Sequence, residues 1–383
     1  MNKEILLAEC NKCLGCKKPI CQAACPANTN VPKVIEAAKN GDYCQAMQII
    51  GHPFGAVCGY VCPHELQCKG ACVLNKKGTP VCCGNVEIQV FEQGYVPQKI
   101  DNALHGVSVA VVGGGVSGIT MAELCYSHGA AVTLFEADEL LHTLKSIPDF
   151  RLPRSVIANA ENSLSHTNVT VKKQFVTEQD IADLSQKFDA VYLSFGATVP
   201  RKLGVVGDDF ATTADEFLRS NRFGNVIVVG GGNTAMDCAR LNVKRGGKST
   251  ILYRRAIAQM PAYKKEIDAA MADGVNFVCA SAPVSVQKDK NNLVVTYVNT
   301  VFDGRNSLSL GTDQQSAKCD VLVSAVGNAL SVTIGGKRLS ANENGLIFGN
   351  VYGGGDAIGG SLVATAVGNA KTAFAAILNR FGR

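Results

Sequence analysis

The residues of this chain that are best suited to chemistry by type and spacing are cysteines near its amino terminus. Twelve of the 16 cysteines fall within the first 83 residues, and eight of those twelve form two short runs. The runs are Cys13, Cys16, Cys21 and Cys25 followed by Pro26, and Cys58, Cys62, Cys68 and Cys72. Thiolates this close together repel one another, so the sequence predicts that they share metal ions or are oxidised to disulfides.

The spacing and the context of these cysteines favour metal over disulfides. The first run, C-x2-C-x4-C-x3-C-P, is close to the ferredoxin pattern in which the fourth cysteine ligates the other of two iron–sulfur clusters. The first residues, MNKEILLAEC, show neither an apolar signal core nor a cleavage site, so we expect a cytoplasmic protein. Cysteines stay reduced in that compartment, which makes metal binding the favoured interpretation.

Composition narrows the class of protein. A length of 383 residues predicts two or three domains, and 46% hydrophobic residues with 39 glycines are typical of an α/β protein rich in tight turns. No apolar stretch reaches the roughly 18 residues that would predict a membrane span. The net charge of +5 is spread along the chain without interleaved aromatic residues, which disfavours nucleic-acid binding.

Two stretches of similar pattern are predicted to hold nucleotides. Residues 107–136 and 225–254 each contain a β-branched strand, a glycine turn, a helix and a second strand. One such loop is weak evidence, because glycine-rich turns between a strand and a helix occur in many α/β folds. Two loops in the same strand–turn–helix–strand context predict two dinucleotide sites.

The first stretch is suited to the ADP half of FAD or to NAD. Gly113 permits the turn, Gly115 lets the backbone approach a pyrophosphate, and Gly118 allows the helix to pack on the strand. The pyrophosphate then lies at the positive end of the following helix. Glu136 ends the second strand, where a carboxylate accepts hydrogen bonds from ribose hydroxyls and repels a 2′-phosphate. A structural turn without a ligand is the alternative.

The second stretch differs at the position that discriminates between nucleotides. The candidate binding residues of its turn are Gly230, Gly232, Asn233 and Ala235. Its second strand ends in Tyr253, Arg254 and Arg255 instead of an acidic residue. Guanidinium groups bind phosphate through paired hydrogen bonds, so the two arginines predict NADPH. A solvated arginine pair at a strand end, with NADH as the ligand, is the alternative.

A third glycine-rich element lies near the end of the sequence. Gly355 and Asp356 follow a short predicted strand over residues 346–352, and a helix is expected from about Ser361. Asp356 is placed to accept a hydrogen bond from a polyol such as the ribityl chain of a flavin. The amino terminus of the helix would then face the electron-rich side of the flavin ring. A turn-forming aspartate without a ligand is the alternative.

The order of these elements predicts that one nucleotide domain is inserted into another. We expect a mainly α-helical domain with the iron–sulfur clusters at residues 1–100, an FAD domain at 101–210 and 326–383, and an NADPH domain at 211–325. Both nucleotide domains are predicted to be Rossmann-like α/β folds. A surface hairpin is expected on the NADPH domain within residues 288–311.

The cysteines beyond residue 83 carry no sign of redox chemistry. They are Cys125, Cys238, Cys279 and Cys319, each isolated in an apolar context, so we expect them in the core. No C-x-x-C pair stands near either nucleotide loop, as a flavoprotein disulfide reductase would need. The sequence therefore favours hydride transfer between bound cofactors over thiol chemistry.

Taken together, the motifs resemble the glutamate synthase small (β) subunit family. The stretches that carry the resemblance are CxxCxxxxCxxxCP, VCGYVCPHELQCKGAC, VVGGGVSG, IPDFRLP, VVGGGNTAMDCAR, YRR, MPA and GGGDAIGGS. The same module forms the N-terminal half of dihydropyrimidine dehydrogenase and the flavoprotein subunit of its bacterial counterpart. The resemblance extends from about Cys13 to the last helix. It implies FAD, NAD(P)H as the reductant, and two [4Fe–4S] clusters.

The resemblance also implies that the two cysteine runs are interleaved as ligands, which spacing alone does not give. One cluster would take Cys13, Cys16, Cys21 and Cys72. The other would take Cys25, Cys62, Cys68 and a non-cysteine ligand at Glu87. Cys58 would then be spare, and Cys82 and Cys83 compete for the position given to Glu87.

The chain departs from the family pattern beside the expected flavin. Before IPDFRLP the family usually has a Gly-Gly pair that lets the backbone pass close to the flavin, and here Leu140 and Leu141 stand in its place. With leucine side chains in place of glycine, we expect FAD to fit differently at this point of the site. Arg151 in the same stretch is a candidate contact for an FAD phosphate.

The favoured function is that of an electron-entry subunit in a hetero-oligomer. NADPH would reduce FAD, and single electrons would leave through two clusters to a partner catalytic subunit of the glutamate synthase or dihydropyrimidine dehydrogenase type. No stretch resembles a site for an organic substrate. One alternative is a self-sufficient NAD(P)H oxidoreductase, a diaphorase, that reduces a small acceptor. Another is a zinc-binding interaction module fused to a nucleotide sensor.

Overall fold

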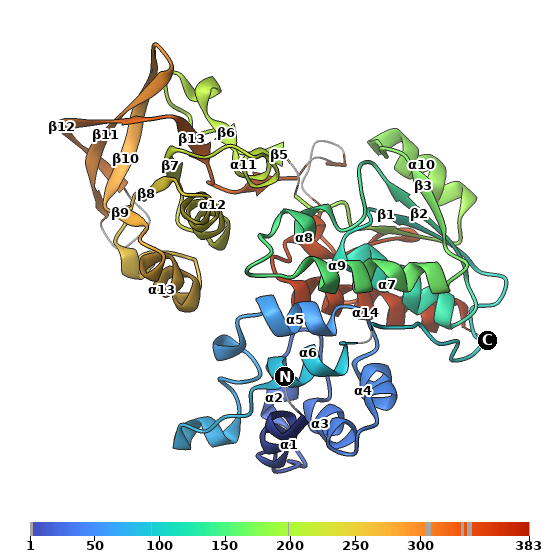
Figure 1. Ribbon diagram of the computed structural model, residues 1–383. Helices are drawn as coiled ribbons and strands as arrows, with labels where there is room; N and C mark the ends of the chain where they lie inside the picture. The colour runs from blue at the N-terminus through green and yellow to red at the C-terminus, as the bar shows by residue number, and fades with distance from the viewer. Residues whose placement is uncertain are drawn as a thin grey trace. The chain divides into compact units, whose positions relative to one another are not determined.

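Two units make up the chain in this computed structural model, which describes residues 3–92, 94–197, 199–302, 308–330, 333–334 and 339–382 (Figure 1). The first unit combines residues 1–145, 149–198 and 330–383, and the second combines residues 146–148 with 199–329. None of the helices within the described ranges has the length and apolar character needed to span a membrane.

The amino-terminal part of the first unit is helical, as the sequence predicts. Its helices are α1 (Lys3–Asn11), α2 (Ile20–Ala23), α3 (Val31–Lys39), α4 (Tyr43–Ile50), α5 (Gly55–Val61) and α6 (Cys83–Val90), with 3-10 turns η1 (His64–Leu66) and η2 (Val73–Lys77). At the start of α3, the Asn30 side chain accepts a hydrogen bond from the Lys33 N–H at 3.3 Å. Val31, Val34 and Ile35 form the buried face of this helix, which packs in a core shared with α1, α4 and α6.

A six-stranded sheet forms the rest of the first unit. Its strands are β1 (Ser108–Val112), β2 (Ala131–Glu136), β3 (Thr170–Lys173), β4 (Ala190–Leu193), β15 (Leu346–Phe348) and β16 (Val351–Gly353). Its other elements are α7 (Val116–Ser127), α8 (His142–Ser146), α9 (Arg154–Asn162), η3 (Ser163–His166), α10 (Glu178–Lys187), η6 (Gly355–Ile358) and α14 (Val363–Phe381). The strand order is β15-β16-β4-β1-β2-β3, and only the β15–β16 pair is antiparallel. Almost every residue of β1 and β4 is buried, as is usual for a parallel sheet covered on both faces.

The second unit repeats this topology. Its strands are β5 (Val199–Pro200), β6 (Thr212–Thr213), β7 (Asn225–Val229), β8 (Lys248–Leu252), β9 (Asn276–Val278), β10 (Ser281–Asp289), β11 (Asn292–Phe302), β12 (Leu308–Cys319), β13 (Val321–Ser324) and β14 (Asn328–Ala329). Its other elements are η4 (Asp208–Phe210), α11 (Ala214–Arg219), α12 (Asn233–Lys244), η5 (Ile257–Gln259) and α13 (Lys264–Ala272). The parallel sheet has the order β6-β13-β7-β8-β9, so β7, α12 and β8 correspond to β1, α7 and β2. The predicted α/β class with two Rossmann-like units is confirmed.

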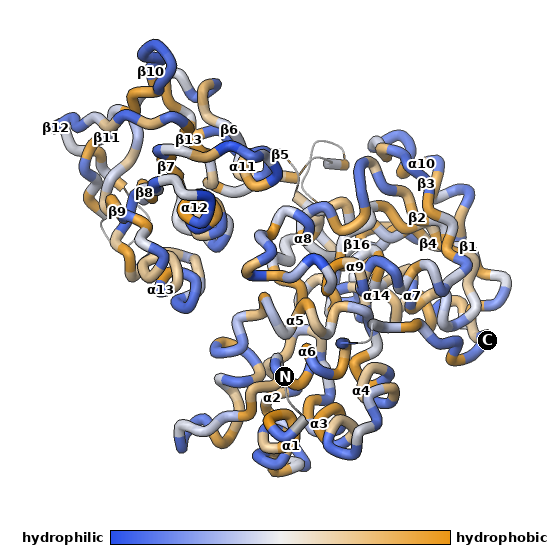
Figure 2. The backbone as a smooth tube through the Cα atoms, in the orientation of Figure 1, coloured by the Kyte–Doolittle hydropathy of each residue, from blue (hydrophilic) through white to orange (hydrophobic). Residues whose placement is uncertain are grey.

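An antiparallel sheet of β10, β11 and β12 extends the predicted surface hairpin. The turn between β10 and β11 is strongly hydrophilic (Figure 2), which fits a turn exposed to solvent. Residues 303–307 of the expected hairpin lie outside the described part of the chain.

The second unit extends beyond the predicted NADPH domain at both ends. Residues 199–200 and 328–329 pair as β5 and β14, so the unit runs from 199 to 329 where the sequence suggested 211–325. The two-residue strands of this pair are too short to give a recognisable pattern in the sequence. The helical region and the first sheet fall together in one unit.

Candidate functional site

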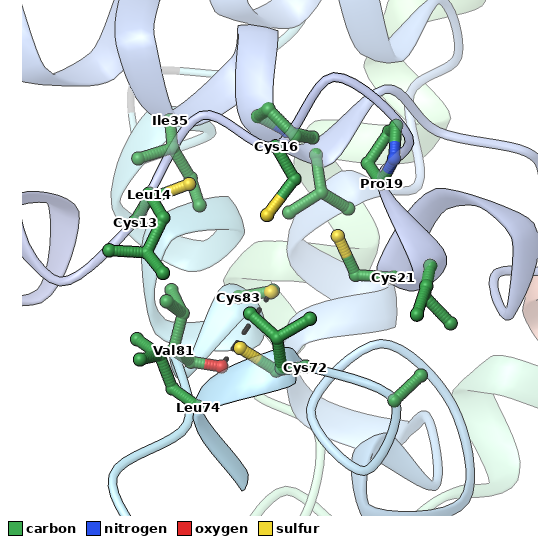
Figure 3. A pocket seen from close by; sticks show the side chains of 15 residues that line it. Cys13, Leu14, Cys16, Pro19, Cys21, Ile35, Cys72, Leu74, Val81 and Cys83 are labelled. Carbon is green, nitrogen blue, oxygen red and sulfur yellow. Dashed lines mark hydrogen bonds between the residues drawn. The ribbon is translucent and has the colours of Figure 1, made fainter.

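The first group of thiols lines one cavity in the helical region. Cys13 and Cys16 lie in the loop after α1, Cys21 lies in α2, and Cys72 precedes η2, so two separate segments meet here. Figure 3 shows these four side chains, together with Cys83 at the start of α6, around a common space. The structure therefore brings together the four ligands expected for the first cluster and adds a fifth thiol.

The electrostatics of this cavity favour a bound cation. The pKa of the Cys21 thiol is raised to about 11, first by burial and then by the Cys13 and Cys72 sulfurs. Negative charge on these sulfurs is therefore costly unless a cation shares it. A metal ion stabilises thiolates, and four thiols around one cavity match the ligation of an iron–sulfur cluster by four cysteines. The residues present fit such a group.

The second group of expected ligands lies in the same helical region and contains one carboxyl group. Glu87 on α6 lines a second cavity, and Cys83 lines both cavities. Burial, followed by the Cys68 and Cys62 sulfurs, holds the pKa of Glu87 well above its usual range. Burial likewise raises the pKa of Cys25, and the Glu87 carboxylate adds to the rise. Charge effects thus relate Glu87 to Cys25, Cys62 and Cys68, although none of these three cysteines lines either of the two cavities.

Two thiols next to the expected ligands have raised pKa values. The Cys83 S–H donates a hydrogen bond to the Val81 carbonyl at 3.7 Å (Figure 3). The neighbouring Cys68 sulfur, followed by burial, holds the pKa of Cys83 well above its usual range. The neighbouring Cys62 sulfur, followed by burial, does the same for the pKa of Cys58. A metal ligand must lose its proton, so the surroundings favour Cys58 and Cys83 as protonated thiols beside the expected ligands Cys62 and Cys68.

Three residues are candidates for the eighth ligand that the sequence predicts. Glu87 and Cys83 line the second cavity, whereas Cys82 lines neither of the two cavities. The Cys82 N–H instead donates a hydrogen bond to the Glu9 side chain. The Cys83 S–H donates a hydrogen bond to the Val81 carbonyl, whereas Glu87 interacts electrostatically with the Cys68 and Cys62 sulfurs, so the surroundings favour Glu87.

The first glycine loop has an open helix terminus. Gly113 has φ +102°, and a Cβ there would lie 2.5 Å from the Ser194 carbonyl oxygen. An added Cβ at Gly118 would overlap the Gly113 carbonyl oxygen, so the helix packs directly on the turn. At Gly115, which precedes α7, an added Cβ would meet nothing within 4 Å. The N–H groups at the start of α7 are thus open to a pyrophosphate, and the loop fits FAD.

The acidic residue expected to bind ribose lies beside this loop. Glu136, at the end of β2, accepts hydrogen bonds from the Gly114 N–H at 2.6 Å and the Asp138 N–H at 2.8 Å. The Leu140 side chain packs over Gly114, and Leu141 has φ +57°. Such a left-handed residue costs roughly 1–2 kcal/mol unless it is glycine. The backbone therefore keeps a left-handed turn at Leu141, where the resemblance predicts glycine. The Leu140 side chain covers part of the first glycine loop.

The second glycine loop repeats the geometry of the first. Gly230 has φ +147°, and an added Cβ would overlap the Ala325 carbonyl oxygen. Gly232 precedes α12, and an added Cβ there would again meet nothing within 4 Å. The Asn233 side chain accepts a hydrogen bond from the Tyr263 N–H at 2.9 Å, and Ala235 is fully buried against the sheet. This loop also fits a pyrophosphate.

The two arginines after β8 differ in their surroundings. The Arg254 side chain is exposed, and its carbonyl accepts a hydrogen bond from the Thr300 hydroxyl at 2.7 Å. Arg255 is half-buried, and its carbonyl accepts a hydrogen bond from the Ala280 N–H at 2.9 Å. In the strand register Tyr253 has the place that Glu136 has in the first unit, and Arg254, the next residue, is the accessible guanidinium.

The third glycine element joins the first sheet to the last helix. Gly355 has φ +62°, and its N–H donates a hydrogen bond to the Asn369 side chain at 3.3 Å. Asp356 is exposed in η6, and α14 begins at Val363, slightly later than expected. Arg151 lies half-buried between α8 and α9. Its contact with an FAD phosphate stays a prediction.

The structure shows features that the sequence did not. Cys83 forms a wall common to both cavities, and Lys371 on α14 reaches the helical region. The sequence suggests Cys83 only as a candidate ligand beside Cys82. Its position along both cavities follows from the packing of the helices. The cysteines expected in the core are buried at Cys125, Cys238 and Cys319 and half-buried at Cys279.

Family models match both parts of the chain. Residues 1–97 match the model described as dihydropyrimidine dehydrogenase domain II, 4Fe-4S cluster. Residues 107–370 match the model described as pyridine nucleotide-disulphide oxidoreductase, which covers well over half of the chain. The first match ends and the second begins between α6 and β1.

Individual proteins with detectable similarity include two curated relatives and a solved structure. The glutamate synthase [NADPH] small chain of Escherichia coli is 26% identical over 97% of this chain and 90% of its own length. The NADPH-Fe(3+) oxidoreductase subunit beta of Geobacter sulfurreducens is 32% identical over 72% of this chain but only 44% of its own length. FprA from Mycobacterium tuberculosis, at 18% identity, matches 71% of this chain and 84% of its own with a TM-score of 0.58. The last similarity concerns the fold alone.

Proposed function

The chain belongs to the pyridine nucleotide-disulphide oxidoreductases, within the glutamate synthase small-chain family, and from that premise we propose that it is an NADPH-dependent electron-entry subunit. It is an NAD(P)H-dependent oxidoreductase with a flavin and nucleotide region and a 4Fe-4S region. The proposal adds three points to this: two clusters, NADPH as the nucleotide, and a partner subunit that accepts the electrons.

Different residues of the two nucleotide loops and of the last glycine element have different binding roles in this function. When bound, the cofactors supply hydride transfer from NADPH to FAD and one-electron transfer through the clusters. Gly115 and Gly232 leave two helix termini open for pyrophosphate groups, and Glu136 is held beside the first of these for ribose hydroxyls. Arg254 offers a guanidinium to the 2′-phosphate. Asp356 is exposed beside the start of the last helix, where it would orient the ribityl chain.

One observation carries the proposal: Cys72 lies with Cys13, Cys16 and Cys21 around one cavity, although it belongs to the other run in the sequence. A second set, Cys25, Cys62, Cys68 and Glu87, is left in the same helical region. Eight donors in two groups of four would also suit two zinc ions. The similarity of residues 1–97 to a 4Fe-4S domain, in a chain with two nucleotide loops, favours clusters that carry electrons.

Metal analysis of anaerobically purified protein tests the number of clusters. Two [4Fe–4S] clusters require about eight iron and eight sulfide per chain. Cys72→Ala should remove about half of the iron, because the first group loses a ligand. Cys58→Ala is the matched control, a buried thiol in the same region that should leave iron unchanged. Two zinc ions and no iron would contradict the proposal, and loss of iron in the Cys58 variant would contradict the ligand assignment.

Stopped-flow kinetics and co-purification test the electron-entry role. Cys21→Ala should leave reduction of FAD by NADPH intact, because the nucleotide loops are elsewhere in the chain. The same variant should abolish electron transfer to the co-purifying partner and spare a dye that accepts electrons from flavin. An unchanged rate of transfer to the partner would mean that the clusters are structural. A chain that purifies without any partner and reduces a small acceptor at full rate would favour the self-sufficient oxidoreductase.

A further inference from the structure

Helix α14 connects the expected flavin loop with the second group of cluster ligands. At its start, the Ala366 carbonyl accepts a hydrogen bond from the Ser117 hydroxyl at 3.0 Å, and the Asn369 side chain accepts from Gly355 N–H. In the same turn, a Cβ at Gly368 would overlap the Pro26 carbonyl oxygen. The helix backbone therefore lies directly against the residue that follows Cys25. Figure 1 shows α14 running beside α7 and α5 within the first unit.

Lys371 projects from this turn into the helical region. Its ammonium group donates hydrogen bonds to the Ile50 carbonyl at 2.9 Å and the Ala27 carbonyl at 3.4 Å. These carbonyls belong to the end of α4 and to the loop after Cys25. No carboxylate among the described residues forms an ion pair with Lys371. Burial lowers the pKa of Lys371, and the Cys25 and Cys58 sulfurs oppose that shift, so the ammonium group interacts electrostatically with this part of the second ligand group.

The neighbouring histidine does not supply a second positive charge. His52 is buried, and its Nδ1 accepts a hydrogen bond from the Phe54 N–H at 3.2 Å. Burial, followed by the charge of Lys371, holds the pKa of His52 well below its usual range. The imidazole is therefore neutral, and the positive charge that we consider at this contact of α14 is that of Lys371.

We propose that Lys371 is a positioning residue for the second cluster, which fixes the Cys25 loop to α14 and favours the reduced state of the cluster through its charge. The inference rests on the proposed function, because it assumes a cluster held by Cys25, Cys62, Cys68 and Glu87. Reduction adds one negative charge to the cluster. A cation held in a partly buried position interacts with that charge more strongly than a solvated one, because water screens it less. Surrounding charge and hydrogen bonding are known to set cluster potentials.

The reduction potential of the second cluster tests this inference. Lys371→Met keeps the length of the side chain and removes the charge. A tenfold change in the reduction equilibrium corresponds to 59 mV for a one-electron couple. We expect Lys371→Met to lower the midpoint potential of the second cluster by at least this amount, as followed by EPR during an anaerobic redox titration. The signal that disappears in Cys62→Ala identifies the second cluster.

Two comparisons control for indirect effects. Arg380→Met removes a cation from the exposed end of the same helix and should leave both potentials unchanged. Lys371→Arg keeps the charge and should keep the potential near that of the unmodified protein. If Lys371→Met loses iron, Lys371→Gln and Lys371→Arg are compared. Restoration of iron by arginine but not by glutamine supports a role for the charge, and equal loss in both overturns it.

Failure of the inference is distinguishable from failure of the proposed function. A full complement of iron with an unchanged potential in Lys371→Met would overturn the role of Lys371 and leave two clusters in place. An unmodified protein with no EPR signal on reduction, and no iron, would overturn the proposed function itself.

Discussion

Replacing Arg254 by alanine is expected to raise the KM for NADPH about tenfold and to leave the KM for NADH nearly unchanged. Its guanidinium is exposed after β8, and the Thr300 hydroxyl holds the backbone carbonyl at 2.7 Å. A hydrogen bond to a charged group contributes roughly 1.5–3 kcal/mol. The lower end of this range applies because solvent screens an exposed guanidinium. About 1.4 kcal/mol corresponds to a tenfold change in affinity.

Two further variants separate phosphate binding from a structural role. Arg254→Lys keeps the charge but loses the paired hydrogen bonds, so its KM for NADPH should fall between those of the unmodified protein and Arg254→Ala. The Arg255 side chain is half-buried, so part of it packs within the fold. Arg255→Ala removes that packing, and we therefore expect it to lower the thermal unfolding temperature and to change the KM for both nucleotides by similar factors.

Steady-state reduction of a dye that accepts electrons from flavin is a suitable assay, because it does not require the partner. KM and kcat are measured with NADPH and with NADH at two ionic strengths. The effect of Arg254→Ala on NADPH should shrink at high salt, since screening weakens the lost interaction. Equal loss with both nucleotides would refute the assignment of Arg254 to a 2′-phosphate and favour a role in pyrophosphate binding or folding.

Three further predictions concern the first unit. Glu136→Gln should lower the FAD content per chain after gel filtration, because a neutral amide binds ribose hydroxyls less well than a carboxylate; full occupancy would contradict the role of Glu136. Gly354→Ala should lower the free energy of unfolding by about 1–3 kcal/mol, because the new Cβ would overlap the buried Tyr192 hydroxyl. Denaturant titration should show partial rescue by Tyr192→Phe, and no rescue would mean that the clash lies elsewhere. Burial raises the pKa of Glu123 to about 8 from an ordinary 4.5. The folded chain thus binds this proton more tightly than the unfolded chain, so the free energy of unfolding should fall as pH rises from about 4.5 to 8, and Glu123→Gln should flatten that slope.

The sequence alone predicted the two nucleotide loops, because their features are local. The turns at Gly113 and Gly230 have positive φ, and an added Cβ at Gly115 or Gly232 would meet open space. Each feature follows from a few consecutive residues between a strand and a helix. The α/β class, with one Rossmann-like unit inside the chain of the other, follows from the order of these local patterns.

Only the tertiary structure decided how the cysteines group. Spacing left open whether Cys72 joins its own run or the first one, since residues so far apart meet through the packing of α1 to α6. The same holds for Cys83, whose place as a wall between two cavities depends on where α6 lies against α3. Lys371 carried no signal in the sequence at all. Its importance arises because close contact at Gly368 brings α14 against the Cys25 loop, and contacts between distant segments are set by packing rather than by local pattern.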